Sequence, residues 1–517
     1  MKKRITALFL AIIMLLALCA CSGDGGVTQT DGAGTTDPLT KDDVITLLVP
    51  SSASWPYRED WKLWEYMSEG SGATLEVSSL PASDAVTKWS LMFAGRDTLP
   101  DLIAFSMGSD ARKYAGEGLI ALEDLEAYMP VYNAWKNSLS KEEYEIIIKN
   151  RITADGKIYY TPGTGREGKT RMRAWLYRED IFKKHDLKIP ETFDEIYEVS
   201  KKLKELYPES YPFSTRSMAY AFNLIGSSFD KWWEYGAYYD HDDGEWRWGA
   251  TEDAALEVVS FYKKMIEEKL APADMVTMNN NSFEELVLTD RTFIMPHLQL
   301  RIDYFNNLAK DKNPNFKIQA FVPPVANAEK GVSMVERGDV ETMGLSVCDT
   351  GKADGIANAA KFIDWMYTDE GMELLSWGKE KETYEVVDGK KRFITDEKNS
   401  GPNTLYGFQL YGSFTRLDPL AAEAVQTETT LESEAMLREH TLPYYPVTMW
   451  LDFSDEEQDV IDMYSSGIRT YTEQMLIKFI LGQEPLSNFD SFRVTIEEMG
   501  VEDLLKTYES AYNRIKG

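Results

Sequence analysis

Cysteine and histidine are scarce in this chain of 517 residues, and this scarcity limits the chemistry that the chain supports. There are three cysteines and four histidines, and the histidines lie far apart, at positions 185, 241, 297 and 440. Neither an HExxH nor a CxxC pattern is present, although such patterns hold metal ligands at a fixed spacing. The sequence therefore gives no support for zinc catalysis, and we expect neither a bound metal nor a cofactor.

Basic residues are few relative to acidic ones. The chain has 55 Lys and Arg against 85 Asp and Glu, a formal net charge of −30 at pH 7. Such an acidic surface repels phosphate backbones and anionic lipid headgroups, which argues against nucleic acid as a partner and against lying flat on a membrane. The same charge disfavours tight binding of a polyanionic polysaccharide, unless a local basic pocket overrides the total.

Long apolar runs are absent after residue 40, and the one near the start is short. Lys2, Lys3 and Arg4 precede a hydrophobic run from Ala7 to Leu18, which is the layout of a secretory signal. This run is shorter than the roughly 20 residues that a membrane-spanning helix needs. An ordinary cleaved signal or an N-terminal membrane helix is the alternative interpretation.

The end of the apolar run resembles the processing site of bacterial lipoproteins. Leu18-Cys19-Ala20-Cys21 follows the lipobox pattern of leucine, two small residues and cysteine. The resemblance implies that residues 1–20 are a signal peptide and that Cys21 is lipidated at the outer face of the cytoplasmic membrane. Residues 21–42 then read as a flexible tether. The processed chain has 52 basic and 85 acidic residues, hence a net charge of −33, and Cys348 is its single free thiol, so no internal disulfide forms.

The segment after the tether has the pattern of an α/β lobe. Short apolar runs at 44–50, 72–80 and 99–107 are typical of buried strands, and helical patterns at 58–70 and 84–97 separate them. Strand, helix, strand, helix and strand within about 60 residues indicate a largely parallel sheet.

A second set of strands and helices follows further along the chain. We expect strands within 171–180 and 316–325, and a strand leading into a helix within 291–303. Capping boxes, in which Ser or Thr precedes Glu by three residues, predict helix starts at Thr192 and Ser454, and a further helix is expected to be capped at Thr251. The last 80 residues look mostly helical. Because no internal repeat and no linker interrupt the chain after the tether, two lobes would be interleaved rather than joined end to end.

Six blocks of the sequence, taken in order, are MFAGRDTLPDLIAF, GEGLIALEDLEAYMP, DGKIYYTPG, WLYREDIFKKHDLKIPETFDEIYEV, AKFIDWMYTDEGMELLSWGKEKETY and YTEQMLIKFILGQEPLSNFDSFRVTIEEMGVEDLLKTYESAYNR. Together they resemble the extracellular solute-binding proteins (family 1) of oligosaccharide ABC importers, especially their long lipoprotein branch. The resemblance implies an α/β, two-lobed, periplasmic-binding-protein-like (type 2) fold with interleaved lobes, a hinge and a helical C-terminal region.

The resemblance also implies domain boundaries and a function. The first lobe would comprise residues 43–177 and 329–438, the second lobe residues 178–328, and residues 439–517 would form C-terminal helices mainly on the second lobe. A ligand held between the lobes closes the hinge, and the membrane permease recognises the closed form. We therefore expect a monomeric, lipid-anchored receptor that captures a carbohydrate, in particular an oligosaccharide, and delivers it to the permease subunits of an ABC transporter.

A sugar-binding cleft needs flat aromatic platforms and planar hydrogen-bonding side chains, and loops that follow strands supply them in α/β lobes. Loop position and the family's blocks together suggest the following ligand-binding candidates: Trp55, Tyr57, Trp175, Arg216, Tyr220, Trp232, Trp233, His297 and Gln299. A buried structural role is the alternative for His297 and for one of the two adjacent tryptophans. Trp61, Trp64 and Trp365 lie on helical stripes and are expected in the core. Arg178 and Asp180 are expected to form an ion pair.

The acidic residues allow other interpretations. The Asp-rich segment 240–244 is expected to form a plain hairpin turn, because the full spacing of a calcium loop with its distal glutamate is missing. Paired carboxylates would suit an extracellular carbohydrate-active enzyme, but the acids cluster on predicted helix surfaces and first turns. A sensor-linked or peptide-binding receptor of the same fold is the other alternative.

Overall fold

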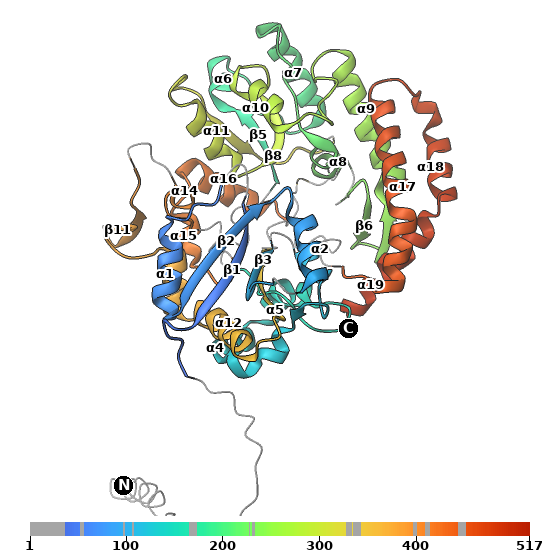
Figure 1. Cartoon of the computed structure of the whole chain (residues 1–517). Helices are drawn as coiled ribbons and strands as arrows, with labels where there is room; N and C mark the ends of the chain where they lie inside the picture. The colour runs from blue at the N-terminus through green and yellow to red at the C-terminus, as the bar shows by residue number, and fades with distance from the viewer. Residues whose placement is uncertain are drawn as a thin grey trace, which may run out of the picture. The chain divides into compact units, whose positions relative to one another are not determined.

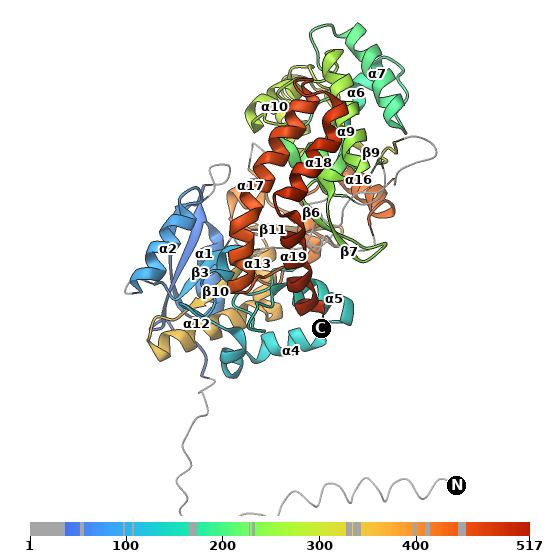
Figure 2. The ribbon, with the colours of Figure 1, turned by 90° about the vertical axis from the view of Figure 1, so that its right-hand side faces the viewer.

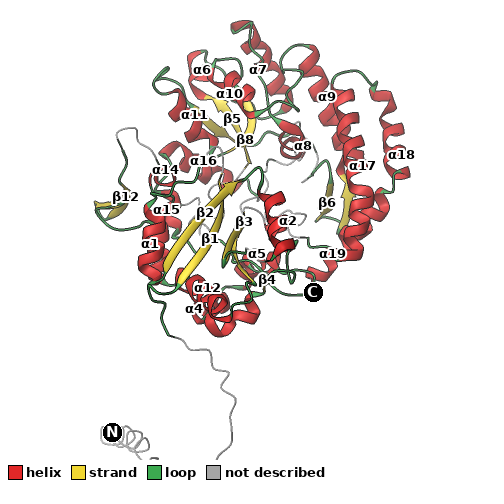
Figure 3. Cartoon of the chain, viewed as in Figure 1, coloured by secondary structure: helices red, strands yellow, loops and turns green. Residues whose placement is uncertain are grey.

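The computed structural model describes residues 37–516, except for the segments 52–55, 97–98, 106–107, 165–172, 227, 230–232, 327–332, 334–342, 397–400, 409–413 and 443–450. Contacts divide the chain into two units, Met1–Asp37 and Pro38–Gly517, and every element below belongs to the second unit. These elements form two main sheets, each with its own helices and its own hydrophobic core (Figures 1 and 3). We refer to them as lobe 1 and lobe 2.

Lobe 1 is built on a five-stranded sheet of order β2-β1-β3-β10-β4. Its strands are β1 (Val44–Ser51), β2 (Thr74–Pro81), β3 (Leu102–Phe105), β4 (Leu119–Ile120) and β10 (Gly344–Cys348). The three strands expected at the start of the lobe are confirmed, and β1 runs parallel to both β2 and β3. The sheet is nevertheless mixed, because β10 arrives from a distant part of the sequence and pairs antiparallel with β3 and β4.

Helices cover this sheet on both sides and bury the expected tryptophans. They are α1 (Lys62–Ser71), α2 (Ala85–Gly95), α3 (Gly108–Arg112), η1 (Leu122–Tyr128), α4 (Pro130–Ser138), α5 (Lys141–Ile147), η2 (Lys149–Arg151), α12 (Ala353–Met366), α13 (Asp369–Ser376), α14 (Pro402–Leu405) and α15 (Pro419–Glu423). Trp61 and Trp64 are buried and Trp365 is half-buried against the same core, so their expected place in the core is confirmed, although Trp61 precedes α1 as its N-cap residue. A hairpin, β11 (Tyr384–Val387) and β12 (Lys390–Phe393), lies beside α13.

Lobe 2 is built on a three-stranded antiparallel sheet of order β8-β5-β9. Its strands are β5 (Arg173–Arg178), β8 (Ile294–Leu298) and β9 (Ile318–Phe321). The surrounding helices are α6 (Glu179–Lys184), α7 (Phe193–Leu206), α8 (Ser217–Gly226), α9 (Asp253–Glu267), α10 (Asn280–Leu288), α11 (Arg301–Ala309) and α16 (Glu428–Glu439). The sheet places β5 beside β8, so that residues from two distant segments meet at one strand pair.

The C-terminal region is helical, as expected, and packs on lobe 2. Its elements are α17 (Asp455–Ile480), η5 (Leu486–Asn488), α18 (Phe489–Glu498) and α19 (Val501–Lys516). Figure 2 shows α17 and α19 side by side, and α17 also contacts α9. The Ser454 capping box is confirmed in full, because the Ser454 hydroxyl accepts from the Glu457 N–H and the Glu457 carboxylate accepts from the Ser454 N–H.

The other two predicted helix starts, at Thr192 and Thr251, lack a complete capping box. Thr192 caps α7 by accepting from the Glu195 N–H, but the Glu195 carboxylate accepts from the Glu191 N–H instead of completing the box. The predicted cap at Thr251 is wrong, since α9 begins at Asp253 after a 3-10 turn, η3 (Gly249–Thr251). The Thr251 hydroxyl donates instead to the Trp248 carbonyl within that turn.

The chain passes between the lobes three times, so the expectation of interleaved lobes is confirmed. It leaves lobe 1 after Thr164, which still pairs with lobe 1, and enters lobe 2 at β5. It returns between β9 and β10, and it leaves lobe 1 again between α15 and α16. β5 pairs with β9 and α16 packs against β9 and α11, so both belong with lobe 2. The sequence assigns nearly all of β5 and α16 to lobe 1, within the expected ranges 43–177 and 329–438.

Candidate functional site

Three of the ligand-binding candidates, Arg216, Tyr220 and His297, meet at one end of the lobe 2 sheet. His297 is the fourth residue of β8, and Arg216 immediately precedes α8, on which Tyr220 lies. The segment before α8 runs alongside β8, because the Ser214 N–H donates to the Ile294 carbonyl. This pairing holds the start of α8 against the end of β8, and the two elements lie next to each other in Figure 1.

The three side chains form a compact cluster around the Tyr220 ring. The Arg216 guanidinium carbon lies 4.9 Å from the centroid of that ring, and the His297 and Tyr220 ring centroids are 5.2 Å apart. The Arg216 Nε–H donates to His297 Nε2 across 3.4 Å. A second guanidinium, that of Arg173 at the start of β5, lies 5.6 Å from the same ring centroid. Two arginines therefore flank one aromatic ring, an arrangement that cation–π attraction favours.

His297 forms the buried floor of this cluster. Its ring is fully buried and lies near two phenylalanines, with centroid distances of 5.3 Å to Phe283 and 6.4 Å to Phe305. Burial lowers the pKa of His297 well below its usual range, and the positive charges of Arg301 and Arg216 lower it further. The imidazole is therefore neutral at physiological pH and has one ring nitrogen that accepts, while the Leu298 backbone nitrogen lies 2.7 Å from Nδ1 and Arg216 Nε lies 3.4 Å from Nε2.

Arg173 is a member of the cluster that the sequence analysis missed. The β5–β8 register pairs Arg173 with Leu298 and Ala174 with His297, which brings the first residue of β5 next to the end of β8. The segment RMRAWLYRED offers the one sequence signal for Arg173, because this arginine opens a strand that the sequence predicts. Strand pairing between distant segments was the missing information.

Three other candidates, Trp175, Trp233 and Gln299, lie buried inside lobe 2 and present no surface to a ligand in this structure. Trp175 is fully buried, with Phe193, Phe213 and Phe321 at its edges. Trp233 is also buried, and its indole N–H donates to the Gly249 carbonyl across 3.0 Å. These rings serve the core, because an aromatic side chain on a covered strand or helix packs inward whatever its chemical suitability for sugar.

Gln299, which follows β8, is turned toward a helix. Its amide nitrogen donates to the Thr430 carbonyl of α16 across 2.9 Å, and the residue is fully buried. This bond ties the end of β8 to the helix that enters lobe 2 at the third passage between the lobes. Gln299 therefore acts in this structure as a structural link beside the cluster.

The remaining candidates lie elsewhere. Tyr57 is on lobe 1, where its ring packs near Trp61 and Trp64 and its hydroxyl donates to the Val77 carbonyl across 3.2 Å. Trp55 and Trp232 lie outside the described residues. The structure thus brings together three of the nine candidates.

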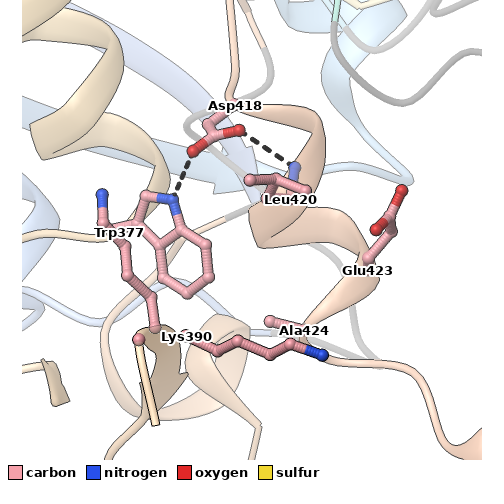
Figure 4. A pocket seen from close by; sticks show the side chains of 8 residues that line it. Trp377, Lys390, Asp418, Leu420, Glu423 and Ala424 are labelled. Carbon is pink, nitrogen blue, oxygen red and sulfur yellow. Dashed lines mark hydrogen bonds between the residues drawn. The ribbon is translucent and has the colours of Figure 1, made fainter. Parts of the chain in front are cut away.

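A pocket of about 530 Å³ occupies a different part of lobe 1, and the sequence did not point to it. Residues of the hairpin β11–β12 and of α15 line it, and Figure 4 shows Trp377, Lys390 and Glu423 among the lining side chains. The Trp377 indole N–H donates to Asp418 Oδ2 across 2.7 Å. Since Trp377 is only 1% exposed, it offers no free face for stacking and acts as a structural residue.

The acidic segment near residue 240 forms the turn that the sequence predicted. The hairpin of β6 (Ala237–Asp240) and β7 (Glu245–Trp248) closes with the Gly244 N–H donating to the Asp240 carbonyl across 2.8 Å. Gly244 has a φ of 78°, which suits glycine. Arg247 supplies the positive charge in the turn: its Nε lies 3.1 Å from Asp240 Oδ2, and it also pairs with Asp243.

The expected ion pair of Arg178 with Asp180 is confirmed. Arg178 Nε and Nη2 each donate to one carboxylate oxygen of Asp180 across 2.8 Å, and Nη1 donates to Asp290 across 2.6 Å. Arg178 is fully buried, and these carboxylates hold its pKa above its usual range although burial alone would lower it. The pair fixes the end of β5 and is structural.

Within the part of the chain that the structure describes, no group of three or more His, Cys, Asp or Glu side chains is placed to hold a metal ion. The described helices also include none with the length and apolar character that crossing a membrane requires.

Comparison with known proteins gives one family and several relatives. The family model for bacterial extracellular solute-binding proteins matches residues 56–373. An uncharacterized ABC transporter extracellular-binding protein of Pyrococcus horikoshii is 30% identical over 208 residues, which span 40% of this chain and 45% of that protein. Lipoprotein LipO of Bacillus subtilis is 22% identical over the whole of this chain and 99% of its own length.

Solved structures share the fold. The alginate-binding protein AlgQ2, determined without calcium ion, superposes with a TM-score of 0.71 at 21% identity, over 93% of this chain and 99% of that one. The ABC-transporter substrate-binding protein FusA of S. pneumoniae, in complex with kestose, has a TM-score of 0.71 at 17% identity, over 92% of this chain and 99% of that one. At these identities the likeness establishes the two-lobed fold alone.

Proposed function

Since the chain belongs to the family of bacterial extracellular solute-binding proteins, as its ordered sequence blocks predict, we propose that it captures a carbohydrate between its lobes and delivers it to an ABC permease. The observation that carries the proposal is the cluster of Arg216, Tyr220 and His297, in which a planar donor and an aromatic ring converge at one end of the lobe 2 sheet. Oligosaccharides present hydroxyl edges and C–H faces to such groups.

Two further observations support a carbohydrate ligand. Structural neighbours of the same fold are named for alginate binding and for a complex with kestose, both of which are carbohydrates. The cluster also lies where a strand ends and a helix begins, a position that suits ligand capture in α/β lobes. We propose that Trp55, Tyr57 and Trp232 also contact the ligand once it is bound, whereas the core positions of Trp175, Trp233 and Gln299 give them supporting roles.

Family membership and the LipO relative indicate an extracytoplasmic location. We further propose that the chain is held there as a monomer by a lipid on Cys21, with residues 21–42 as a tether. A tethered receptor stays near its transporter, so that captured ligand reaches the permease at a high local concentration. The lobe ranges expected from the sequence, shifted to include β5 and α16 in lobe 2, are part of this proposal.

The family and the fold are those of binding proteins, and we propose binding without turnover as the function of this chain as well. The alternative of a carbohydrate-active enzyme predicts degraded sugar. A sensor-linked receptor of the same fold would have a partner other than the permease, and a peptide-binding receptor would bind peptides instead of sugars.

Thermal unfolding of the protein in the presence of a panel of oligosaccharides and peptides would test the proposal. A ligand that binds only the folded protein adds about 2.7 kcal/mol of stability at 100 times its dissociation constant. A selective shift with one class of oligosaccharide, and recovery of that sugar intact, is the expected result. Shifts with peptides alone, or cleavage of the sugar, would contradict carbohydrate capture.

A further inference from the structure

We infer that the ligand bears a carboxylate, as in a uronic-acid-containing oligosaccharide, and that Arg216 binds this carboxylate. The inference rests on the proposed function, since it specifies the chemical class of carbohydrate held at the cluster of Arg216, Tyr220 and His297. The starting point is the state of the Arg216 side chain.

Arg216 is partly exposed and has no carboxylate partner among the described residues, where its guanidinium contacts only His297 and the Tyr220 ring. Two other arginines of lobe 2, Arg178 and Arg301, are paired with acids. Arg178 donates to Asp180 across 2.8 Å, and Arg301 lies 3.0 Å from Glu284. In a chain with 85 acidic residues, an arginine held by aromatic groups without an acid is suited to an acid from outside.

The contacts of Arg216 leave its two terminal nitrogens available to bind a carboxylate. Its Nε–H is used by His297, and one region of its guanidinium plane lies against Tyr220. The two terminal nitrogens, Nη1 and Nη2, keep their N–H groups, and this end of the guanidinium matches the two oxygens of a carboxylate. Because His297 and Tyr220 fix the side chain before ligand arrives, little conformational entropy is lost on binding.

The charges near Arg216 also favour an anionic ligand. The guanidinium of Arg173 lies on the same tyrosine ring as that of Arg216. The ten-residue helix α8 begins at Ser217, next to Arg216, so its positively polarised N-terminus adds to the field. The cluster is thus the kind of local basic site that overrides an acidic total charge, and it favours an anionic sugar over a neutral one.

Calorimetric titration of the full chain, purified in detergent, tests the inference. The probes are trigalacturonate and trimannuronate, each compared with the same trisaccharide after reduction of its carboxyl groups. Loss of a charge-assisted hydrogen-bond pair corresponds to about a 10- to 100-fold change in affinity. We expect an acidic trisaccharide to bind at least tenfold more tightly than its reduced counterpart.

Two matched variants assign this preference to Arg216. Arg216→Gln is expected to abolish the preference, and Arg216→Lys to restore part of it, since lysine keeps the charge but lacks the planar fork. Arg392→Gln, an identical change of charge on the exposed hairpin of lobe 1, should leave the preference unchanged. Circular dichroism confirms that each variant is folded.

The outcomes separate the inference from the proposed function. Tight binding of reduced or other neutral oligosaccharides with no preference for the acids would overturn the carboxylate inference and leave carbohydrate capture standing. Equal binding of the acids by Arg216→Gln and the unaltered chain would overturn the role of Arg216. Failure of every acidic and neutral oligosaccharide to bind would overturn both.

Discussion

The buried imidazole of His297 predicts a specific dependence of stability on pH. In the folded chain its pKa lies well below 6.5, because the ring is buried and two arginines are near, whereas the unfolded chain has an ordinary histidine there. As the pH falls through 6.5, the unfolded state takes up a proton that the folded state does not. The free energy of unfolding therefore decreases on acidification and is fully retained above that pH.

The size of the effect follows from the same linkage. Between pH 7.5 and pH 5.5, His297 alone should remove about 1.4 kcal/mol from the free energy of unfolding, provided that the folded ring stays neutral throughout. His297→Gln keeps a polar atom near Nε2 for Arg216 but does not titrate, so its stability should lack this contribution. Any fixed cost of the substitution is independent of pH and cancels in the comparison.

Urea unfolding of both proteins at several pH values measures the difference directly. The stability gap between His297→Gln and the unaltered chain should move by about 1.4 kcal/mol in favour of the variant over this range. Carboxylates and the other histidines titrate equally in both proteins and do not affect the gap. A gap that stays constant with pH would show that the folded ring accepts a proton as readily as a free histidine, and would refute the burial argument.

Three further predictions concern packing, the buried ion pair and the anchor. Gly226→Ala places a Cβ 1.8 Å from a Trp233 ring carbon and should cost about 1–3 kcal/mol in urea unfolding, whereas Gly236→Ala, with open space around it, should be nearly neutral. Arg178→Met should lower the unfolding free energy by about 3–5 kcal/mol, because two carboxylates lose their buried partner; a loss below 1 kcal/mol would argue against the pair. Cys21→Ser should abolish incorporation of labelled fatty acid, and persistent labelling would exclude this residue as the lipid site.

The sequence predicted the first three strands and the first two helices of lobe 1 and the C-terminal helices, because their signals are local. The run at β1 contains the apolar residues that a buried strand needs, and the Ser454–Glu457 capping box fixes a helix start with two reciprocal bonds. The antiparallel entry of β10 was not predictable in this way, since strand order depends on contacts between segments more than 200 residues apart in the sequence.

The candidate site was predictable in part, because residue type and loop position can be read locally whereas burial and strand pairing cannot. Arg216, Tyr220 and His297 were identified from loop position and residue type, and the fold brings them together. Trp175 has equally suitable chemistry for sugar, but the helices and strand that cover β5 bury it, and no local pattern reveals that cover. Arg173 was missed because its relation to Tyr220 exists only once β5 pairs with β8.

The place of β10 between β3 and β4 has a consequence for how the protein matures during export. As the chain emerges, β3 and β4 appear early, yet neither pairs with the other, and each waits for the strand at Gly344–Cys348. Until then β4 and the edge of β3 that does not face β1 have no strand partner, and the delay places a long loop closure late in folding. Lobe 2, whose three strands lie between residues 173 and 321, has its whole sheet available sooner. The lobe nearer the N-terminus is thus the one that completes its sheet last.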